Sequence, residues 1–180
     1  KENKDWKCLI NNASMFQYDL GESFDIDTLN KHMLVNFVVP TLLIRALYCN
    51  LKSNNHIKSK NNVAVNILDA KLFGLNPDFY SYTLSKQSMF GLTKMSALSY
   101  APILRVNGIA PGITLPAHGQ TEEEFLKAHK KNLLNKSSSM KELENALELL
   151  VDSPSMTGHV ILLDGGAHLS PPTRDVSFDN

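Results

Sequence analysis

The sequence is poor in the residues that build metal and disulfide sites. Its two cysteines, Cys8 and Cys49, stand far apart, and neither belongs to a CxxC pair. Both lie among apolar residues, so we expect them to be small buried side chains in a reducing compartment. The six histidines form no HExxH or HxH cluster. The sequence therefore argues against a metal site.

Charge imbalance and long apolar runs are also missing. The 18 basic and 18 acidic residues cancel, whereas a protein that binds nucleic acid or a membrane surface needs a concentrated basic excess. No apolar run reaches the ~18 to 20 residues of a transmembrane helix, and no signal peptide opens the sequence. We therefore expect a soluble, cytoplasmic protein with no nucleic-acid or membrane partner. The 180 residues, 43% of them hydrophobic, suffice for one domain with a core.

Hydrophobic periodicity predicts alternating strands and helices over a single domain, 1–180. Strands are expected at 7–14 (with the loop that follows), 62–68, 103–112 and 159–166, and helices at 25–50, 79–100 and 121–152. Pro40 lies inside the first helix and predicts a local irregularity near Asn36. The tail, 170–180, is polar and rich in proline, and we expect it to be mobile or docked on a partner subunit. This order predicts an α/β fold with a parallel sheet and helices on both faces.

Ligands of such sheets bind at the carboxyl ends of the strands. The loops concerned follow Ile10, Leu68, Ala110 and Leu163. Near them Tyr82 and Lys86 are four residues apart and share one face of a helix. A free phenol has a pKa near ~10, and a neighbouring ammonium lowers it. The pair is therefore predicted to donate a proton to a substrate that receives hydride, with a solvated surface pair as the alternative.

Several short motifs together resemble the C-terminal two-thirds of a short-chain dehydrogenase/reductase. They are Asn11-Asn12-Ala13-Ser14, Asn36, Tyr82-x-x-x-Lys86, Asn107 with Pro111-Gly112, and Asp164-Gly165-Gly166. They occur in the family's order and with roughly its spacing. The resemblance implies an NAD(P)H-dependent oxidoreductase with a Rossmann-like, doubly wound parallel sheet whose N-terminal strands are missing from this chain.

The resemblance also implies roles for individual residues. Tyr82 would be the catalytic acid, and Lys86 would lower its pKa and hold the nicotinamide ribose. Asn36 would anchor the water or backbone network that supplies protons to Lys86; an ordinary helix-interior amide is the alternative. The cofactor would contact Asn12, Ala13, Ser14, Tyr82, Lys86, Pro111, Gly112 and Thr114.

Asp69 stands where most of the family has a serine. With Tyr82 and Lys86 it resembles the pteridine reductases and the bacterial dihydromonapterin/dihydrofolate reductases of the same superfamily. A pterin presents ring N–H and amino donors, and its reduction adds a proton to a ring nitrogen, so a carboxylate suits it better than a serine. We therefore predict reduction of a pterin or folate with NADPH. A loop aspartate that caps the next turn is the alternative reading of Asp69.

Two aromatic residues support a flat substrate. In the pteridine reductases the residues that match Ser14 and Phe16 face the pterin, and the aromatic ring stacks on it. Phe79, three residues before Tyr82, matches another aromatic at the edge of that pocket. Plain core packing is the alternative for both phenylalanines.

The sequence lacks the glycine-rich turn that receives a dinucleotide pyrophosphate in this superfamily. Its nine glycines form neither a GxxxGxG nor a GxGxxG pattern. About 70 to 85 residues of the usual domain would be absent. We expect a fragment, with a natural remnant that binds no dinucleotide as the alternative. The choice of NADPH over NADH is inferred from the family, because its determinants lie in that part.

Two other functions stay open at this point. One is a different short-chain reductase, acting on a ketone or a ketoacyl thioester, in which Asp69 is incidental. The other is a non-catalytic, truncated relative that serves as a subunit or binding module. The helices 25–50 and 79–100 match those that pair between subunits in the family, so the resemblance implies a homodimer or tetramer.

Overall fold

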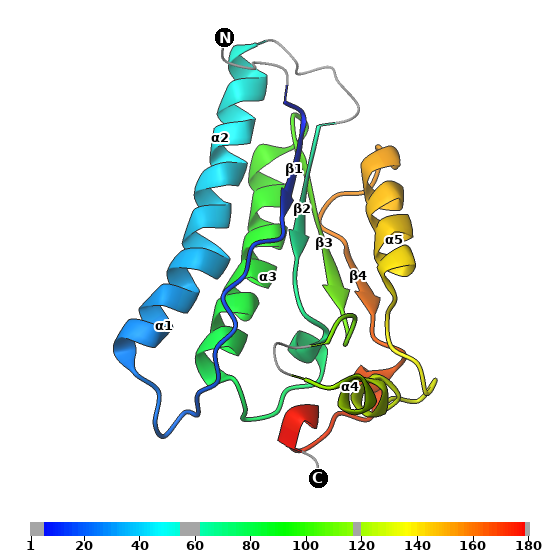
Figure 1. Cartoon of the computed structure of the whole chain (residues 1–180). Coiled ribbons are helices and arrows are strands. Elements are labelled where there is room, and N and C mark those ends of the chain that lie inside the picture. Colours follow the sequence, from blue (N-terminus) through cyan, green and yellow to red (C-terminus); the bar gives the residue numbers. More distant parts are fainter. Residues whose placement is uncertain (1–5, 55–61, 117–119, 179–180) are drawn as a thin grey trace.

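The computed structural model describes residues 6–54, 62–116 and 120–178, built around a four-stranded sheet (Figure 1). The strands lie in chain order: β1 (Cys8–Asn11), β2 (Val63–Ile67), β3 (Arg105–Pro111) and β4 (Val160–Leu163). Every neighbouring pair is parallel. The carboxyl ends of all four strands therefore meet at one edge, as the sequence predicts.

Helices cover both faces of the sheet (Figure 1). They are α1 (Ile26–Met33), α2 (Val39–Ser53), α3 (Tyr80–Tyr100), α4 (Glu122–His129) and α5 (Met140–Asp152). Helices α2 and α3 pack on one face, and α5 packs on the other. The expected Rossmann-like α/β architecture is confirmed.

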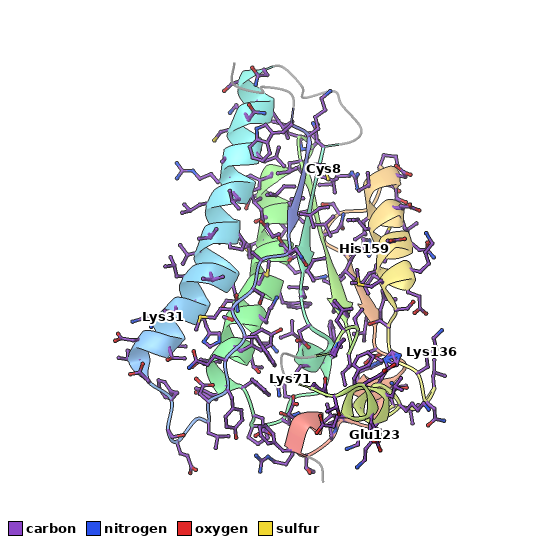
Figure 2. The ribbon with its side chains drawn as sticks, in the orientation of Figure 1. Cys8, Lys31, Lys71, Glu123, Lys136 and His159 are labelled. Carbon is purple, nitrogen blue, oxygen red and sulfur yellow. The ribbon has the colours of Figure 1, made fainter. Side chains whose placement is uncertain are left out.

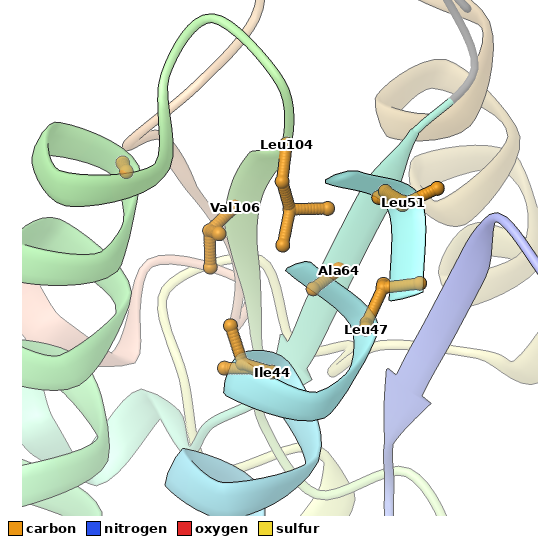
Figure 3. Packing of buried hydrophobic residues seen from close by; sticks show 7 residues of the cluster. Ile44, Leu47, Leu51, Ala64, Leu104 and Val106 are labelled. Carbon is orange, nitrogen blue, oxygen red and sulfur yellow. The ribbon is translucent and has the colours of Figure 1, made fainter. Parts of the chain in front are cut away.

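Strand β2 is buried on both faces because its alternate side chains enter two different cores. Ala64 packs with Ile44 and Leu47 of α2, as Figure 3 shows. Val63 and Val65 point the other way and pack in a cluster with α5. All three β2 residues are fully buried. This two-sided burial holds the loop after β2 at the centre of the carboxyl edge.

The first long helix is interrupted where Pro40 predicts it. A π-helical turn, η1 (Leu34–Val38), joins α1 to α2 and contains Asn36. Pro40 has no N–H to donate to the carbonyl of Asn36, four residues earlier, so a regular α-helical bond cannot form there. The wider π turn accommodates this gap and turns the Asn36 side chain into the protein, where it is fully buried.

The same helical run bears on the expectation that no segment spans a membrane. The sequence suggested no membrane-spanning segment, yet Ile26–Ser53 is long and apolar enough to cross a membrane by length and composition alone. A core helix of a globular protein passes the same test, so this is weak evidence. Leu34, Val38 and Leu42 are exposed on this run, on the element predicted to pair with a second subunit.

The region 121–152, expected to be one helical region, consists of two helices. Both α4 and α5 begin with a capping box, formed by Thr121 with Glu124 and by Ser139 with Glu142. In each box the hydroxyl accepts from a backbone N–H while the carboxylate accepts from the cap residue. The Ser-x-x-Glu pattern at 139–142 therefore marks a new helix start that the overall periodicity hid.

Both cysteines are exposed, which corrects the expectation that they are buried. Cys8 lies on β1, the strand at one edge of the sheet. Cys49 lies on α2, one residue beyond Tyr48 and away from the buried Leu47 and Leu51. Apolar sequence neighbours did not decide burial here, because an edge strand and a half-exposed helix each leave one side uncovered.

The segment after β4 lies against its own chain. It forms the short turns η4 (Ala167–Leu169) and η5 (Val176–Phe178) and passes below the strand ends in Figure 1. The Arg174 side chain binds Asp78, in the loop before α3. Within the described residues, 170–178, the tail is therefore attached to its own chain, and docking on a partner subunit stays a prediction.

Candidate active site

A cavity of about 360 Å³ opens at the carboxyl edge of the sheet. Its walls come from the loop after β1, the loops after β2, β3 and β4, and the C-terminal segment. The residues that line the cavity include Phe16, Asp69, Tyr82, Gly112, Thr114 and Asp175. The loops that the sequence predicts to form the ligand site thus line one cavity together.

Asp69 and Tyr82 meet in this cavity. The Tyr82 hydroxyl donates to Oδ2 of Asp69 at 2.6 Å. The other carboxylate oxygen, Oδ1, accepts from the backbone N–H of Lys71 at 2.8 Å and caps the 3₁₀ turn η3 (Ala70–Phe73). The capping interpretation of Asp69 is thus confirmed for Oδ1, while the role of Oδ2 toward a substrate stays a prediction.

The pKa of Tyr82 is raised well above its usual value, by burial first and by the negative charge of Asp69 second. The prediction that Lys86 lowers the pKa of Tyr82 is therefore wrong. The Tyr82 hydroxyl is paired with a carboxylate, and only 6% of the residue is exposed. The phenol therefore remains protonated at neutral pH. It is held as a hydrogen-bond donor, the form that an acid catalyst needs.

Lys86 lies beside Tyr82 on the same helical face, as predicted. Its ammonium donates to the carbonyl of Ile67 at 2.8 Å and lies 5.7 Å from the centre of the Tyr82 ring. Burial lowers the pKa of Lys86 to about 8. Within the described residues this is the single hydrogen bond of its ammonium, so two N–H donors are available for the hydroxyls of a bound ribose.

Asn36 joins the loop after β1 to helix α3. Its Oδ1 accepts from the backbone N–H of Met15 at 2.7 Å and from the Ser14 hydroxyl at 3.2 Å. Its Nδ2 donates to the Met15 carbonyl and to the Ser85 hydroxyl, both at 2.9 Å. Asn36 is therefore a buried cross-link between segments, more than an ordinary helix-interior amide, and its partner Ser85 precedes Lys86 directly.

The predicted aromatic residues stack on each other. The rings of Phe16 and Phe79 are 4.2 Å apart and nearly parallel, and Phe16 meets the Tyr82 ring edge-on at 4.7 Å. Phe16 lines the cavity and is 55% exposed, whereas Phe79 is buried beneath it and does not line the cavity. The structure thus separates a ring that a flat ligand can reach from a ring that supports it.

Most of the predicted cofactor contacts lie at the same edge. Gly112 and Thr114, after the end of β3 at Pro111, line the cavity. Gly112 tolerates no side chain, because a Cβ there would lie 2.6 Å from the Ser137 hydroxyl. The other predicted contacts do not line the cavity: Lys86 is buried, Pro111 ends β3, and Asn12, Ala13 and Ser14 are exposed after β1.

The sequence interpretation missed the polar residues that close the far side of the cavity. Lys71, two residues after Asp69, lies near the C-terminal turn (Figure 2) and pairs with Asp175 at 3.6 Å. Nδ1 of His168 forms a hydrogen bond with Oδ2 of Asp164 at 2.8 Å. Both residues line the cavity. The sequence offered one indication of these residues: Lys71 follows Asp69, and His168 follows Asp164, by a few residues.

A known family matches almost all of this chain. The family model described as enoyl-(acyl carrier protein) reductase matches residues 2–168. The chain belongs to the short-chain dehydrogenase/reductase superfamily. Its relatives place it in the pteridine reductase-like branch of that superfamily, which confirms the resemblance seen in the sequence.

Two relatives carry this placement. The dihydromonapterin reductase of Klebsiella pneumoniae is 26% identical over 163 residues, which is 91% of this chain and 67% of the relative. The FolM alternative dihydrofolate reductase 1 of Brucella suis, solved in complex with NADP, is 36% identical with a TM-score of 0.85, over 94% of this chain and 66% of that one.

A 4-hydroxyisoleucine dehydrogenase complexed with NADH, 24% identical with a TM-score of 0.78 over 89% of this chain and 67% of that one, shares the fold. The chain thus spans about two thirds of the length of the proteins that it matches.

Proposed function

We propose that this chain is the catalytic part of an NADPH-dependent reductase that acts on a dihydropterin or dihydrofolate. The single observation that carries the proposal is the hydrogen bond between the Tyr82 hydroxyl and Asp69 at 2.6 Å in the cavity. The names of the Klebsiella and Brucella relatives, and the NADP bound in the Brucella structure, support it.

The chemistry divides between the cofactor and the side chains of this chain. Bound NADPH would supply the hydride for the carbon of a C=N bond in the pterin ring. Tyr82 then donates its hydroxyl proton to the ring nitrogen of that bond, so that one hydride and one proton are added in total. Asp69 accepts from the ring N–H and amino donors of the substrate, which a serine would hold less strongly.

The residues at the strand ends suit a bound nicotinamide nucleotide. Lys86 has two free ammonium donors for the ribose hydroxyls and is held at the end of β2 by the Ile67 carbonyl. Gly112 and Thr114 line the cavity where the nicotinamide would lie. Phe16 offers an exposed ring face on which a flat heterocycle can stack.

We expect the enzyme to be a homodimer or tetramer. Exposed apolar residues recur on the α1–α2 run, at Leu34 and Leu42, and on α3, at Met95 and Leu98. Apolar faces of this kind mark interaction surfaces. Light scattering on the native protein tests this expectation, and a monomer at all concentrations would contradict it.

The test of the function is a substrate comparison with the complete natural chain. NADPH oxidation is measured with dihydromonapterin, dihydrofolate and an acetoacetyl thioester. We expect turnover of the two pterin-containing compounds and little or none of the thioester. Preference for the thioester would show a ketoacyl reductase, and failure to bind any nicotinamide nucleotide would show a non-catalytic relative.

A further inference from the structure

We propose that the C-terminal segment, Pro171–Phe178, forms the substrate-side wall of the cavity and limits the size of the substituent that a bound dihydropterin can carry. This inference rests on the proposed function, which supplies the substrate class. It assigns substrate selection to residues outside the Tyr82, Lys86 and Asp69 site.

The segment is fixed by a fully buried carboxylate. Asp78 is 0% exposed and accepts from Nε and Nη2 of Arg174, each at 2.8 Å, and from the backbone N–H of Asp175 at 2.7 Å. The Tyr18 hydroxyl adds a contact at 3.3 Å. These bonds, those of Arg174 first, hold the pKa of Asp78 at about 2. A buried carboxylate left without these donors would be costly, so the segment is bound with its charge matched.

A row of aromatic rings in contact connects the segment to the cavity. The Phe178 ring lies 4.8 Å from the Tyr18 ring, and Tyr18 meets Phe79 edge-on at 5.2 Å. Phe79 in turn stacks on Phe16, the exposed ring in the cavity. The C-terminal turn thus supports, through two rings, the surface on which the substrate would stack.

The segment also lines the cavity itself. Pro172, Asp175 and Val176 are among the lining residues. The Asp175 carboxylate lies 3.6 Å from the ammonium of Lys71, in the turn that Asp69 caps. The segment therefore reaches the loop of Asp69, the carboxylate predicted to bind the substrate, and closes the cavity on that side.

The cavity is small for the two ligands that it has to receive. Its 360 Å³ is near the lower end of the ~300–1,000 Å³ typical of ligand pockets, and a nicotinamide and a pterin ring would share it. In this proposal a short substituent on the pterin fits beside Val176, and the longer aminobenzoyl-glutamate of a folate meets the wall. Loosening the wall should therefore favour the larger substrate.

The experiment compares three variants of the complete natural chain. Arg174→Gln weakens the attachment to Asp78, Val176→Ala enlarges the cavity without touching that attachment, and Lys141→Ala is a control on the exposed side of α5. For each variant, kcat/KM is measured with dihydromonapterin and with dihydrofolate. The dissociation constants of both compounds are measured by fluorescence titration.

We expect the ratio of dihydrofolate to dihydromonapterin kcat/KM to rise by roughly fivefold or more in Arg174→Gln and about twofold in Val176→Ala. The dissociation constants should shift in the same sense, and the control should match the native chain. Unchanged ratios in both folded variants would overturn the proposal. If Arg174→Gln does not fold, Val176→Ala decides alone.

The proposed function can fail separately. If neither compound is reduced but both bind, the function is wrong and the ratio of dissociation constants still decides the role of the wall. If neither compound binds, both proposals are overturned.

Discussion

Asn36 and Asp78 are both fully buried polar side chains, and each attaches one wall of the cavity to the body of the protein. Asn36 holds the loop after β1 through the backbone of Met15 and reaches α3 through Ser85. Asp78 holds the C-terminal segment through Arg174 and the backbone of Asp175. The first attachment is neutral, and the second depends on a buried charge and its counter-charge.

The difference teaches how firmly each wall is attached. A buried amide with all its hydrogen bonds made needs no proton and no counter-ion, so its attachment is independent of pH and salt. A carboxylate attachment depends on ionisation and on an arginine whose own side chain is 48% exposed. The attachment made by Asn36 is therefore insensitive to pH, whereas the attachment made by Asp78 weakens in strong acid.

The largest effect should come from removing the acid between the two walls. Tyr82→Phe deletes the hydroxyl that donates to Asp69, and we expect a loss of reductase activity on the order of 10²–10⁴-fold with both walls intact and pterin still bound. Steady-state assays and a pterin titration measure this. Tyr80→Phe, on the same helix and outside the cavity, is the control; wild-type turnover by Tyr82→Phe would refute the assignment.

The second largest effect should come from replacing Asp69. Asp69→Ser should lower kcat/KM for a dihydropterin by about 10–100-fold, since a charge-assisted hydrogen bond is lost. It should also lower the pKa of Tyr82, because the Asp69 charge is one of the causes that raise it. Ultraviolet titration of the phenol in native and variant chains shows this shift, and an unchanged or higher pKa would contradict it.

The neutral attachment is tested by Asn36→Ala. The change leaves the Met15 N–H and the Ser85 hydroxyl without their buried partner, so the free energy of unfolding should fall by about 1–3 kcal/mol. Thermal or urea unfolding measures this. Asn30→Ala, an exposed asparagine on the same helix, should change stability little, and equal losses in the two variants would contradict the role of Asn36.

The smallest effect is the release of the charged attachment by acid. Because the folded-state pKa of Asp78 is depressed to about 2, its contribution is complete above about pH 4 and is lost as pH falls toward 2. Hydrogen-exchange protection of the Asp175 amide, bound to Asp78, should fall over this range. The Met15 amide, bound to Asn36, should keep its protection; equal behaviour of the two amides would remove the distinction.

The sequence predicts the attachment made by Asn36 better than the attachment made by Asp78. Tyr82 and Lys86 lie within one regular helix, where spacing alone fixes which side chains share a face, and Asn36 lies in the irregular turn that Pro40 predicts. Asp78 and Arg174 are 96 residues apart in loops, where no periodicity connects them. The sequence also misjudged the pKa of Tyr82, because burial and the distance to Asp69 are properties of the folded chain.

The predicted break in the first helix shows a second kind of success. Pro40 lacks a donor, and that local fact predicts an irregularity without any knowledge of packing. The exposure of Cys8 and Cys49 was out of reach for the opposite reason, since it depends on which elements cover β1 and α2.

The two oxygens of Asp69 divide their hydrogen bonds between structure and ligand. Oδ1 keeps the backbone of η3 in place through Lys71, and only Oδ2 is engaged with Tyr82. In the proposed function, a ring donor of the substrate would therefore replace the tyrosine at Oδ2 while the loop keeps its conformation. The site is preorganised, and substrate exchange costs little reorganisation of the backbone at the point where the proton moves.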